Sequence, residues 1–75
     1  MESALSPELL DVVALTEDIP EHGLKRGQVG TVVEMLPPDA YEVEFVDQSG
    51  ETYAMLPLRA SQVLVLRYQP ARMAA

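Results

Sequence analysis

The stretch that decides the fold is residues 23–50, GLKRGQVGTVVEMLPPDAYEVEFVDQSG. It contains two runs rich in β-branched and aromatic residues, which a Pro-Pro pair separates and two glycines precede. Such runs, bounded by turn-forming residues, are typical of antiparallel strands joined by a hairpin. The stretch therefore predicts strands over residues 29–36 and 41–46.

The second run alternates apolar and acidic residues, and this alternation defines its two faces. Its apolar members are Tyr41, Val43 and Phe45. Glu42 and Glu44 lie between them. Because successive side chains of a strand point to opposite faces, we expect the apolar residues in the core and the two carboxylates in solvent.

The first run is expected to place Glu34 on the solvent face as well. The residues that then point inward are Thr31, Val33 and Met35, and Val32 points outward. Pairing Met35 with Tyr41 sets Glu34 opposite Glu42, whereas a slip of one residue would bury Glu34. Like charges that face each other are mildly destabilising, so this register indicates a surface kept acidic for a partner.

A turn over Asp47-Gln48-Ser49-Gly50 is predicted to lead into a fourth strand over residues 52–56. Gly50 suits the left-handed position that closes a three-residue hairpin loop. That loop would set Tyr53 opposite Phe45 and Met55 opposite Val43. Pro57 has no N–H to donate, so we expect it to end the strand.

Strands are also predicted over residues 11–15 and 63–66, with a one-turn helix over 58–62 before the last strand. A long loop over 16–28 contains Ile19 and Leu24, so we expect it to fold back on the core. Together these elements predict an all-β fold, a small five-stranded antiparallel SH3-like barrel in which the last strand pairs with the first. An OB-fold is the alternative, but it would usually have longer strands and a helix between the third and fourth.

The barrel is predicted to span residues 11–67 of a single domain. Residues 1–10 are expected to form a tail or a short helical turn capped by Ser6, and residues 68–75 a C-terminal tail. The hydrophobic fraction of 48% suffices for a core, and the absence of cysteine excludes disulfides and thiolate metal sites.

The charge of the chain limits its partners. Twelve acidic and five basic residues give a net charge of −7, which disfavours nucleic acids and anionic membranes. A protein partner with a basic face would suit such a surface. The N-terminus lacks the positive charge of a signal peptide, and we expect a cytoplasmic protein.

The runs DVVALTEDIPEHGLKRGQVGTVVE and YEVEFVDQSGETYA resemble a family of small bacterial proteins, domain of unknown function 4926. The similarity extends from Asp11 to about Leu66. It implies an SH3-like barrel and a partner encoded nearby, and it supplies no activity, cofactor or catalytic residue. Residues 27–32, GQVGTV, also resemble the KOW motif of ribosomal and transcription factors, but without the surrounding Lys and Arg residues of RNA-binding members.

The sequence contains no constellation of residues that predicts catalysis. His22 is the single histidine, and neither a nucleophile nor an orienting carboxylate accompanies it in a recognisable pattern. No serine lies in a Gly-x-Ser-x-Gly elbow, and the acidic residues lack the spacing of a calcium loop. We therefore predict that the chain is not an enzyme and needs no cofactor or metal.

The leading hypothesis is a non-catalytic protein–protein interaction module that binds a genomically neighbouring partner, such as a toxin-like protein or an enzyme. Its candidate partner-binding residues are Glu17, Asp18, Glu34, Glu42, Glu44 and Tyr53. One alternative is a KOW-type RNA-binding or ribosome-associated module, which would use Lys25, Arg26 and Arg59. A third hypothesis is a homo-oligomeric structural unit, because small cores often need a second copy.

Overall fold

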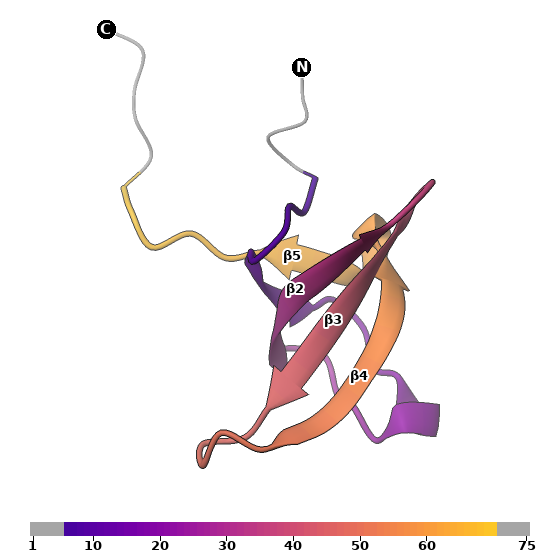
Figure 1. Cartoon of the computed structure of the whole chain (residues 1–75). Coiled ribbons are helices and arrows are strands. Elements are labelled where there is room, and N and C mark those ends of the chain that lie inside the picture. The colour runs from indigo at the N-terminus through magenta and orange to yellow at the C-terminus, as the bar shows by residue number, and fades with distance from the viewer. Residues whose placement is uncertain (1–5, 71–75) are drawn as a thin grey trace, which may run out of the picture.

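The computed structural model describes residues 6–70, which form one antiparallel sheet bent into a small barrel (Figure 1). The strands are β1 (Val12–Leu15), β2 (Val29–Leu36), β3 (Ala40–Val46), β4 (Thr52–Arg59) and β5 (Val63–Val65). Two short 3-10 helices, η2 (Pro20–His22) and η3 (Ala60–Gln62), complete the described elements. The predicted all-β fold of five antiparallel strands, with a single helical turn before the last, is confirmed.

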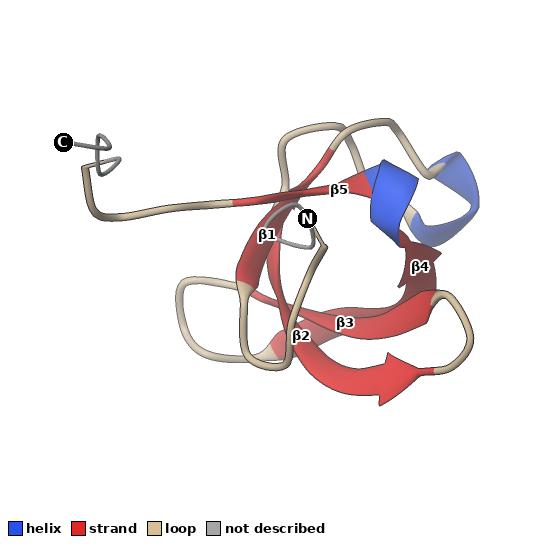
Figure 2. Ribbon diagram, turned by 90° about the horizontal axis from the view of Figure 1, so that it is seen from above, coloured by secondary structure: helices blue, strands red, loops and turns tan. Residues whose placement is uncertain are grey.

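The order of strands across the sheet is β4-β3-β2-β1-β5, so the last strand lies beside the first (Figure 2). Val13 pairs with Val65 and Leu15 pairs with Val63, which confirms the predicted pairing of the last strand with the first. β4 lies at the other end of the order and pairs with β3 alone. The sheet therefore has two edges, one at β4 and one at β5.

Pro57 does not end the fourth strand, and this expectation is wrong. β4 continues to Arg59, and Pro57 pairs with Glu42 of β3. A proline is tolerated in an edge strand because only one side of that strand must supply hydrogen bonds to a neighbour. The helical turn that follows is accordingly shorter than predicted and begins at Ala60.

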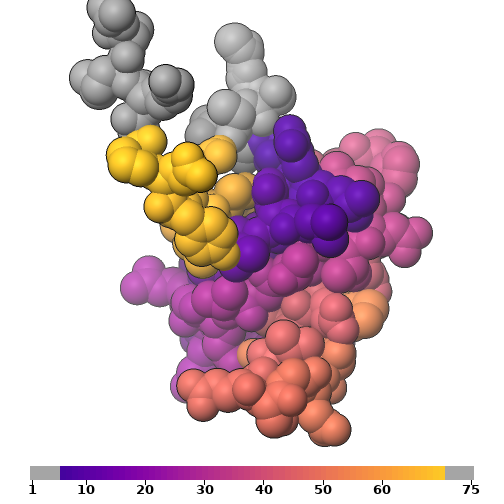
Figure 3. Space-filling model, turned by 60° about the vertical axis from the view of Figure 1, so that its left-hand side comes forward, coloured from indigo at the N-terminus to yellow at the C-terminus, as the bar shows by residue number. Residues whose placement is uncertain are grey.

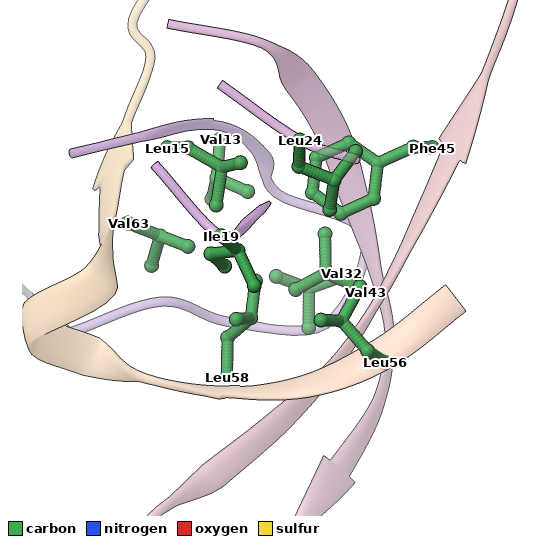
Figure 4. Close-up of a cluster of buried hydrophobic side chains, with 10 residues drawn as sticks. All are labelled: Val13, Leu15, Ile19, Leu24, Val32, Val43, Phe45, Leu56, Leu58 and Val63. Atoms are coloured by element: carbon green, nitrogen blue, oxygen red, sulfur yellow. The ribbon is translucent and has the colours of Figure 1, made fainter. Parts of the chain in front are cut away.

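Ten hydrophobic side chains form the core, and Figure 4 shows them converging on the interior of the barrel. They are Val13, Leu15, Ile19, Leu24, Val32, Val43, Phe45, Leu56, Leu58 and Val63. Phe45 is the largest fully buried side chain. Ile19 and Leu24 come from the long first loop, where they form an isolated bridge, so the loop folds onto the core as predicted.

The hairpin of β2 and β3 has the predicted register near its turn. Met35 pairs with Tyr41, and Glu34 pairs with Glu42. Glu34 is exposed, as expected from its acidic side chain. The two carboxylates therefore lie side by side on the outer face of this hairpin.

A β-bulge at Val33 reverses the faces of β2 beyond the acidic pair. The next pair joins Val32 to Val43, which leaves Val33 without a partner. Val32 is fully buried, Thr31 shares the outer face with Glu44, and Met35 is exposed beyond the core. The prediction that Thr31 and Val33 point inward and Val32 outward is therefore wrong, because one extra residue shifts the parity. Met35 lies on the turn side of the bulge and keeps the predicted face, the one it shares with Tyr41.

The turn between β3 and β4 has the predicted length. The amide of Asp47 donates to the carbonyl of Glu51 at 2.9 Å, and the amide of Gly50 donates to the carbonyl of Asp47 at 3.0 Å. Gly50 has a φ of 90°, the left-handed conformation expected for it. The turn chemistry was therefore readable from these four residues.

A second bulge, at Tyr53, changes the pairing that follows this turn. Thr52 pairs with Val46 and Ala54 pairs with Phe45, so Tyr53 is the extra residue. The predicted pairing of Tyr53 with Phe45, and of Met55 with Val43, is wrong for this reason. Met55 instead lies on the outer face, opposite Glu44.

The N-terminal segment forms a tight turn rather than the helical turn expected over residues 8–10. The amide of Glu8 donates to Oδ2 of Asp11 at 2.8 Å, and Leu10 has a left-handed φ of 71°. The amide of Leu10 donates to the carbonyl of Val32 at 2.7 Å, so the turn is anchored beside the β2 bulge. The proposed cap is therefore supplied by Asp11 instead of Ser6.

Both ends of the described chain lie at one end of the barrel (Figures 1 and 3). A groove separates them, lined by Leu10, Asp11 and Val12 on one side and by residues 66–70 on the other. The turn between β3 and β4 lies at the opposite end of the molecule (Figure 1). Tails were predicted over residues 1–10 and 68–75, and their outer parts, residues 1–5 and 71–75, fall outside the described residues.

Candidate functional site

Three carboxylates gather on the outer side of β2 and β3, and we call Glu34, Glu42 and Glu44 the acidic face. Glu34 and Glu42 are a directly opposed pair. Glu44 follows two residues after Glu42 on the same strand, so both side chains point to the same side of the sheet. The sheet therefore brings together three of the six residues predicted to bind a partner.

The neighbours of the acidic face on β4 carry no charge. Pro57 lies opposite Glu42, and Met55 lies opposite Glu44. The hydroxyl of Thr52 donates a hydrogen bond to Oε2 of Glu44. The directly paired positions thus offer apolar surface and a hydroxyl in place of cations that could neutralise the carboxylates.

The two acids of the first loop serve the structure of the loop itself. Oδ1 of Asp18 accepts a hydrogen bond from the amide of Arg26 at 2.8 Å. Oε2 of Glu17 accepts one from Nε2 of Gln62 at 3.0 Å, which joins the loop to η3. The amide of Thr16 strengthens the same junction by donating to the carbonyl of Gln62. Glu17 and Asp18 are thus separate from the acidic face.

Tyr53 also lies apart from the acidic face. Its ring is tilted against that of Phe45, with 6.2 Å between the ring centroids. Its hydroxyl accepts a hydrogen bond from Nε2 of Gln28 at 3.1 Å, so the side chain reaches toward the end of the first loop. Tyr41 is partly buried and packs against the core, as expected from its place among the apolar residues of its strand.

The three basic residues considered for RNA binding each lie near an acidic group or its partner. Lys25 and Arg26 are adjacent in the first loop, where Asp18 binds the amide of Arg26. Arg59 donates its amide to Oε1 of Gln62, whose Nε2 is bound to Glu17. The backbones of Arg26 and Arg59 are thus tied to the part of the first loop that carries Asp18 and Glu17, whereas phosphate binding favours a continuous basic surface.

The model of the family Domain of unknown function (DUF4926) matches this chain over residues 9–65. The chain belongs to this family. No curated protein and no solved structure matches the chain. The DUF4926 match contains all five strands and ends at the last residue of β5. The family resemblance drawn from the sequence is therefore confirmed.

In the described part of this DUF4926 chain, the side chains that could bind a metal ion do not form a suitable cluster. Residues 6–70 contain no cluster of three or more His, Cys, Asp or Glu side chains that could hold a metal ion. His22 lies exposed at the end of η2. The same residues include no helix with the length and apolar character needed to cross a membrane.

Asp47 is the acidic residue with the most distinctive local environment. Its pKa is lowered, first by the Ser49 hydroxyl, which donates to Oδ1 at 2.7 Å, and next by the amide of Glu51. The amide of Ser49 also donates to this oxygen. These bonds stabilise the ionised carboxylate within the turn, which identifies Asp47 as a turn-forming residue.

Sequence reasoning missed two exposed apolar positions of the DUF4926 fold. Met55 borders the acidic face because the Tyr53 bulge moves it outward. Leu64 of β5 is 60% exposed although it lies within an apolar run. The run Val63-Leu64-Val65-Leu66 was the available signal, since an edge strand exposes one side of such a run.

Proposed function

We propose that this chain is a non-catalytic protein–protein interaction module whose acidic face binds a basic surface on a protein partner. The observation that carries the proposal is the grouping of Glu34, Glu42 and Glu44 beside uncharged positions of β4. A genomically neighbouring protein, such as a toxin-like protein or an enzyme, fits this role. We place the interaction in the bacterial cytoplasm.

Glu34 and Glu42 place two like charges directly opposite each other. Like charges directly opposite each other on a sheet cost about 0.2–1 kcal/mol, and folding gains nothing from them. A partner that places Lys or Arg between them would relieve this repulsion and add charge-assisted hydrogen bonds. Binding therefore supplies the favourable interaction that the isolated domain lacks.

Met55 and Pro57 give the same face an apolar border. A docking surface combines apolar contacts, which contribute to affinity, with charged groups that steer the partner and set its orientation. We therefore expect the partner to present basic side chains flanked by apolar ones. The phosphates of a nucleic acid would repel the carboxylates of the acidic face.

The experiment compares two charge-matched variants in affinity capture from the native cell. The test variant carries Glu34→Gln, Glu42→Gln and Glu44→Gln, which neutralise the acidic face. The control variant carries Glu8→Gln, Glu21→Gln and Glu51→Gln, three exposed acids elsewhere on the molecule. Both variants lose three negative charges. A difference in their binding of the captured protein therefore depends on where the charges lie and not on how many are lost.

We expect the protein captured by the wild type to bind the test variant at least ~10-fold more weakly, a loss of ~1.4 kcal/mol. The control variant should retain most of the binding, and added salt should weaken the wild-type complex. Equal binding by both variants would remove the acidic face from the interaction. Tight, salt-sensitive binding of RNA to the wild type would instead favour the KOW-type hypothesis.

A further inference from the structure

The two edges of the sheet differ in how well they resist pairing with another chain. The edge strand β4 contains Pro57, which cannot donate a backbone hydrogen bond, and ends at Arg59, whose amide is bound to Gln62. β5 and the residue after it, Val63 to Leu66, contain neither proline nor charge. Proline and charge are common protections of sheet edges, so β5 is the less protected one.

The backbone of β5 also directs hydrogen-bonding groups away from the barrel. The amide of Leu66 donates to the carbonyl of Val12, and the carbonyl of Gln62 accepts from the amide of Thr16. In an antiparallel ladder, alternate residues bond to the same neighbour. The even-numbered residues therefore face β1, and the amide and carbonyl of Val65 point to the open edge. Figure 2 shows the chain after β5 running away from the barrel.

The outward side chains of this segment are apolar and exposed. Leu64 is 60% exposed and Tyr68 is 80% exposed. Leu66 lies between them and lines the groove beside Leu10. Because side chains alternate along an extended chain, these three share the outer side of the strand. They form an apolar row at the edge of the sheet.

The charge of the chain favours contact between copies at this segment above others. All twelve acidic residues precede Thr52, and the described chain from Thr52 to Pro70 contains Arg59 and Arg67 but no acid. Two copies that each carry a net charge of −7 repel each other through the rest of their surfaces. The C-terminal segments themselves add no negative charge to a contact between copies.

We propose that β5 pairs antiparallel with β5 of a second copy, with Leu66 opposite the partner subunit's Leu66. This register sets Leu64 opposite the partner's Tyr68, so the two most exposed apolar side chains of the row cover each other. A shift of two residues in one direction would oppose Arg67 to its copy, and a shift in the other would oppose Tyr68 to Gln62. Cross-strand aromatic–aliphatic pairs stabilise a sheet, and the proposed register forms two of them without opposing like charges.

This pairing joins two five-stranded sheets into one continuous sheet and uses a surface separate from the acidic face. The acidic face lies on β2 and β3, and β1 separates β2 from β5. Each dimer would therefore present two acidic faces. The β5 pairing does not depend on the proposed protein partner. The dimer and the binding of a partner by the acidic face are tested by different measurements.

A single-cysteine variant tests the register directly, because the chain has no cysteine of its own. In the proposed dimer, residue 66 and its copy form a non-hydrogen-bonded pair, with Cα atoms ~4.5 Å apart, which suits a disulfide. Leu66→Cys should therefore oxidise to a covalent dimer on a non-reducing gel. Met55→Cys, on the other edge strand, is the matched control and should remain mostly monomeric. Equal rates of cross-linking would overturn the proposed register.

Light scattering tests the dimer itself. The wild type should have twice the 8.2 kDa mass of one chain. The double variant Leu64→Lys and Tyr68→Lys should be monomeric with an unchanged circular dichroism spectrum, since both side chains are exposed. The control, Tyr53→Lys with Met55→Lys, should remain dimeric. A wild type that is monomeric at about 1 mM, or a double variant that is still dimeric, would overturn the proposal.

Discussion

The two faces of β3 differ in their side chains and in their burial. Val43 and Phe45 point inward and are completely buried, whereas Glu42 and Glu44 alternate with them on the outer face. The inner face excludes water and holds the barrel together. The outer face opposes Glu42 to Glu34, an arrangement that folding alone does not favour. The difference teaches that core packing explains one side of this strand and does not explain the other.

The largest loss of stability is expected from substitution of Phe45, the largest side chain of the inner face. Phe45→Ala should lower the free energy of unfolding by about 3–5 kcal/mol, because it leaves a cavity among Val43, Leu24 and their neighbours. Urea denaturation measures this loss. Val46→Ala, on the exposed end of the same strand, is the control and should cost less than about 1 kcal/mol. Similar losses would show that the inner face is not the main source of stability.

The assignment of faces on β2 can be sharpened with two adjacent valines. Val32→Thr places a hydroxyl in the core and should cost about 1–3 kcal/mol, because the buried group lacks a partner. Val33→Thr makes the same chemical change at the half-exposed bulge and should cost less than about 0.5 kcal/mol. Chemical denaturation of both variants compares them. A larger loss at Val33 would mean that the bulge lies elsewhere.

The outer face should respond in the opposite direction. Glu34→Gln removes one of two opposed charges and should raise the free energy of unfolding by about 0.2–0.5 kcal/mol at low salt. Added salt should reduce the gain, since it screens the repulsion in the wild type. Glu21→Gln, on the exposed η2, is the matched control. Destabilisation by Glu34→Gln would show that the carboxylate supports the fold.

The smallest effect on stability is expected in the turn that joins β3 to β4. Hydrogen bonds from Ser49 and Glu51 lower the pKa of Asp47 below its ordinary value of 3.8. A lowered pKa in the folded state means that the ionised carboxylate stabilises the fold above that value, and the benefit is lost as pH falls through the lowered pKa.

Asp47→Ala should therefore be less stable than the wild type at neutral pH, with a difference that shrinks on acidification below about pH 4. Thermal unfolding of both proteins across this pH range measures the difference. Gln48→Ala, which keeps the carboxylate, should follow the wild type. A constant difference down to the lowest pH would exclude ionisation of Asp47 as the cause.

The sequence predicted the strands well because each has a local signature. β2 has the predicted bounds of residues 29–36, and β3 differs by one residue at its start. The bulge in β2 could not be foreseen, because either of the adjacent valines 32 and 33 fits a core position equally well. The choice depends on Val43 across the hairpin and on Leu10, which binds the carbonyl of Val32. Such choices belong to tertiary contacts rather than to local preference.

The acidic face was partly predictable for the same reason. The alternation of Glu42 and Glu44 with apolar residues indicated it directly. The roles of Glu17 and Asp18 were not readable, because Gln62 lies 45 positions from Glu17 and the Asp18 bond is made by a backbone amide. Their part in binding a partner remains a prediction, and their substitution would also disturb the first loop.

The position of the chain ends has a consequence for how this domain behaves when it is attached to something else. Residues 6–11 and 66–70 lie at the same end of the barrel, and the turn at Asp47 lies at the other (Figure 1). A domain whose chain enters and leaves at the same end is attached to its neighbours at that end alone. Pulling on both ends would therefore peel the first and last segments away from the barrel before load reached the hairpins.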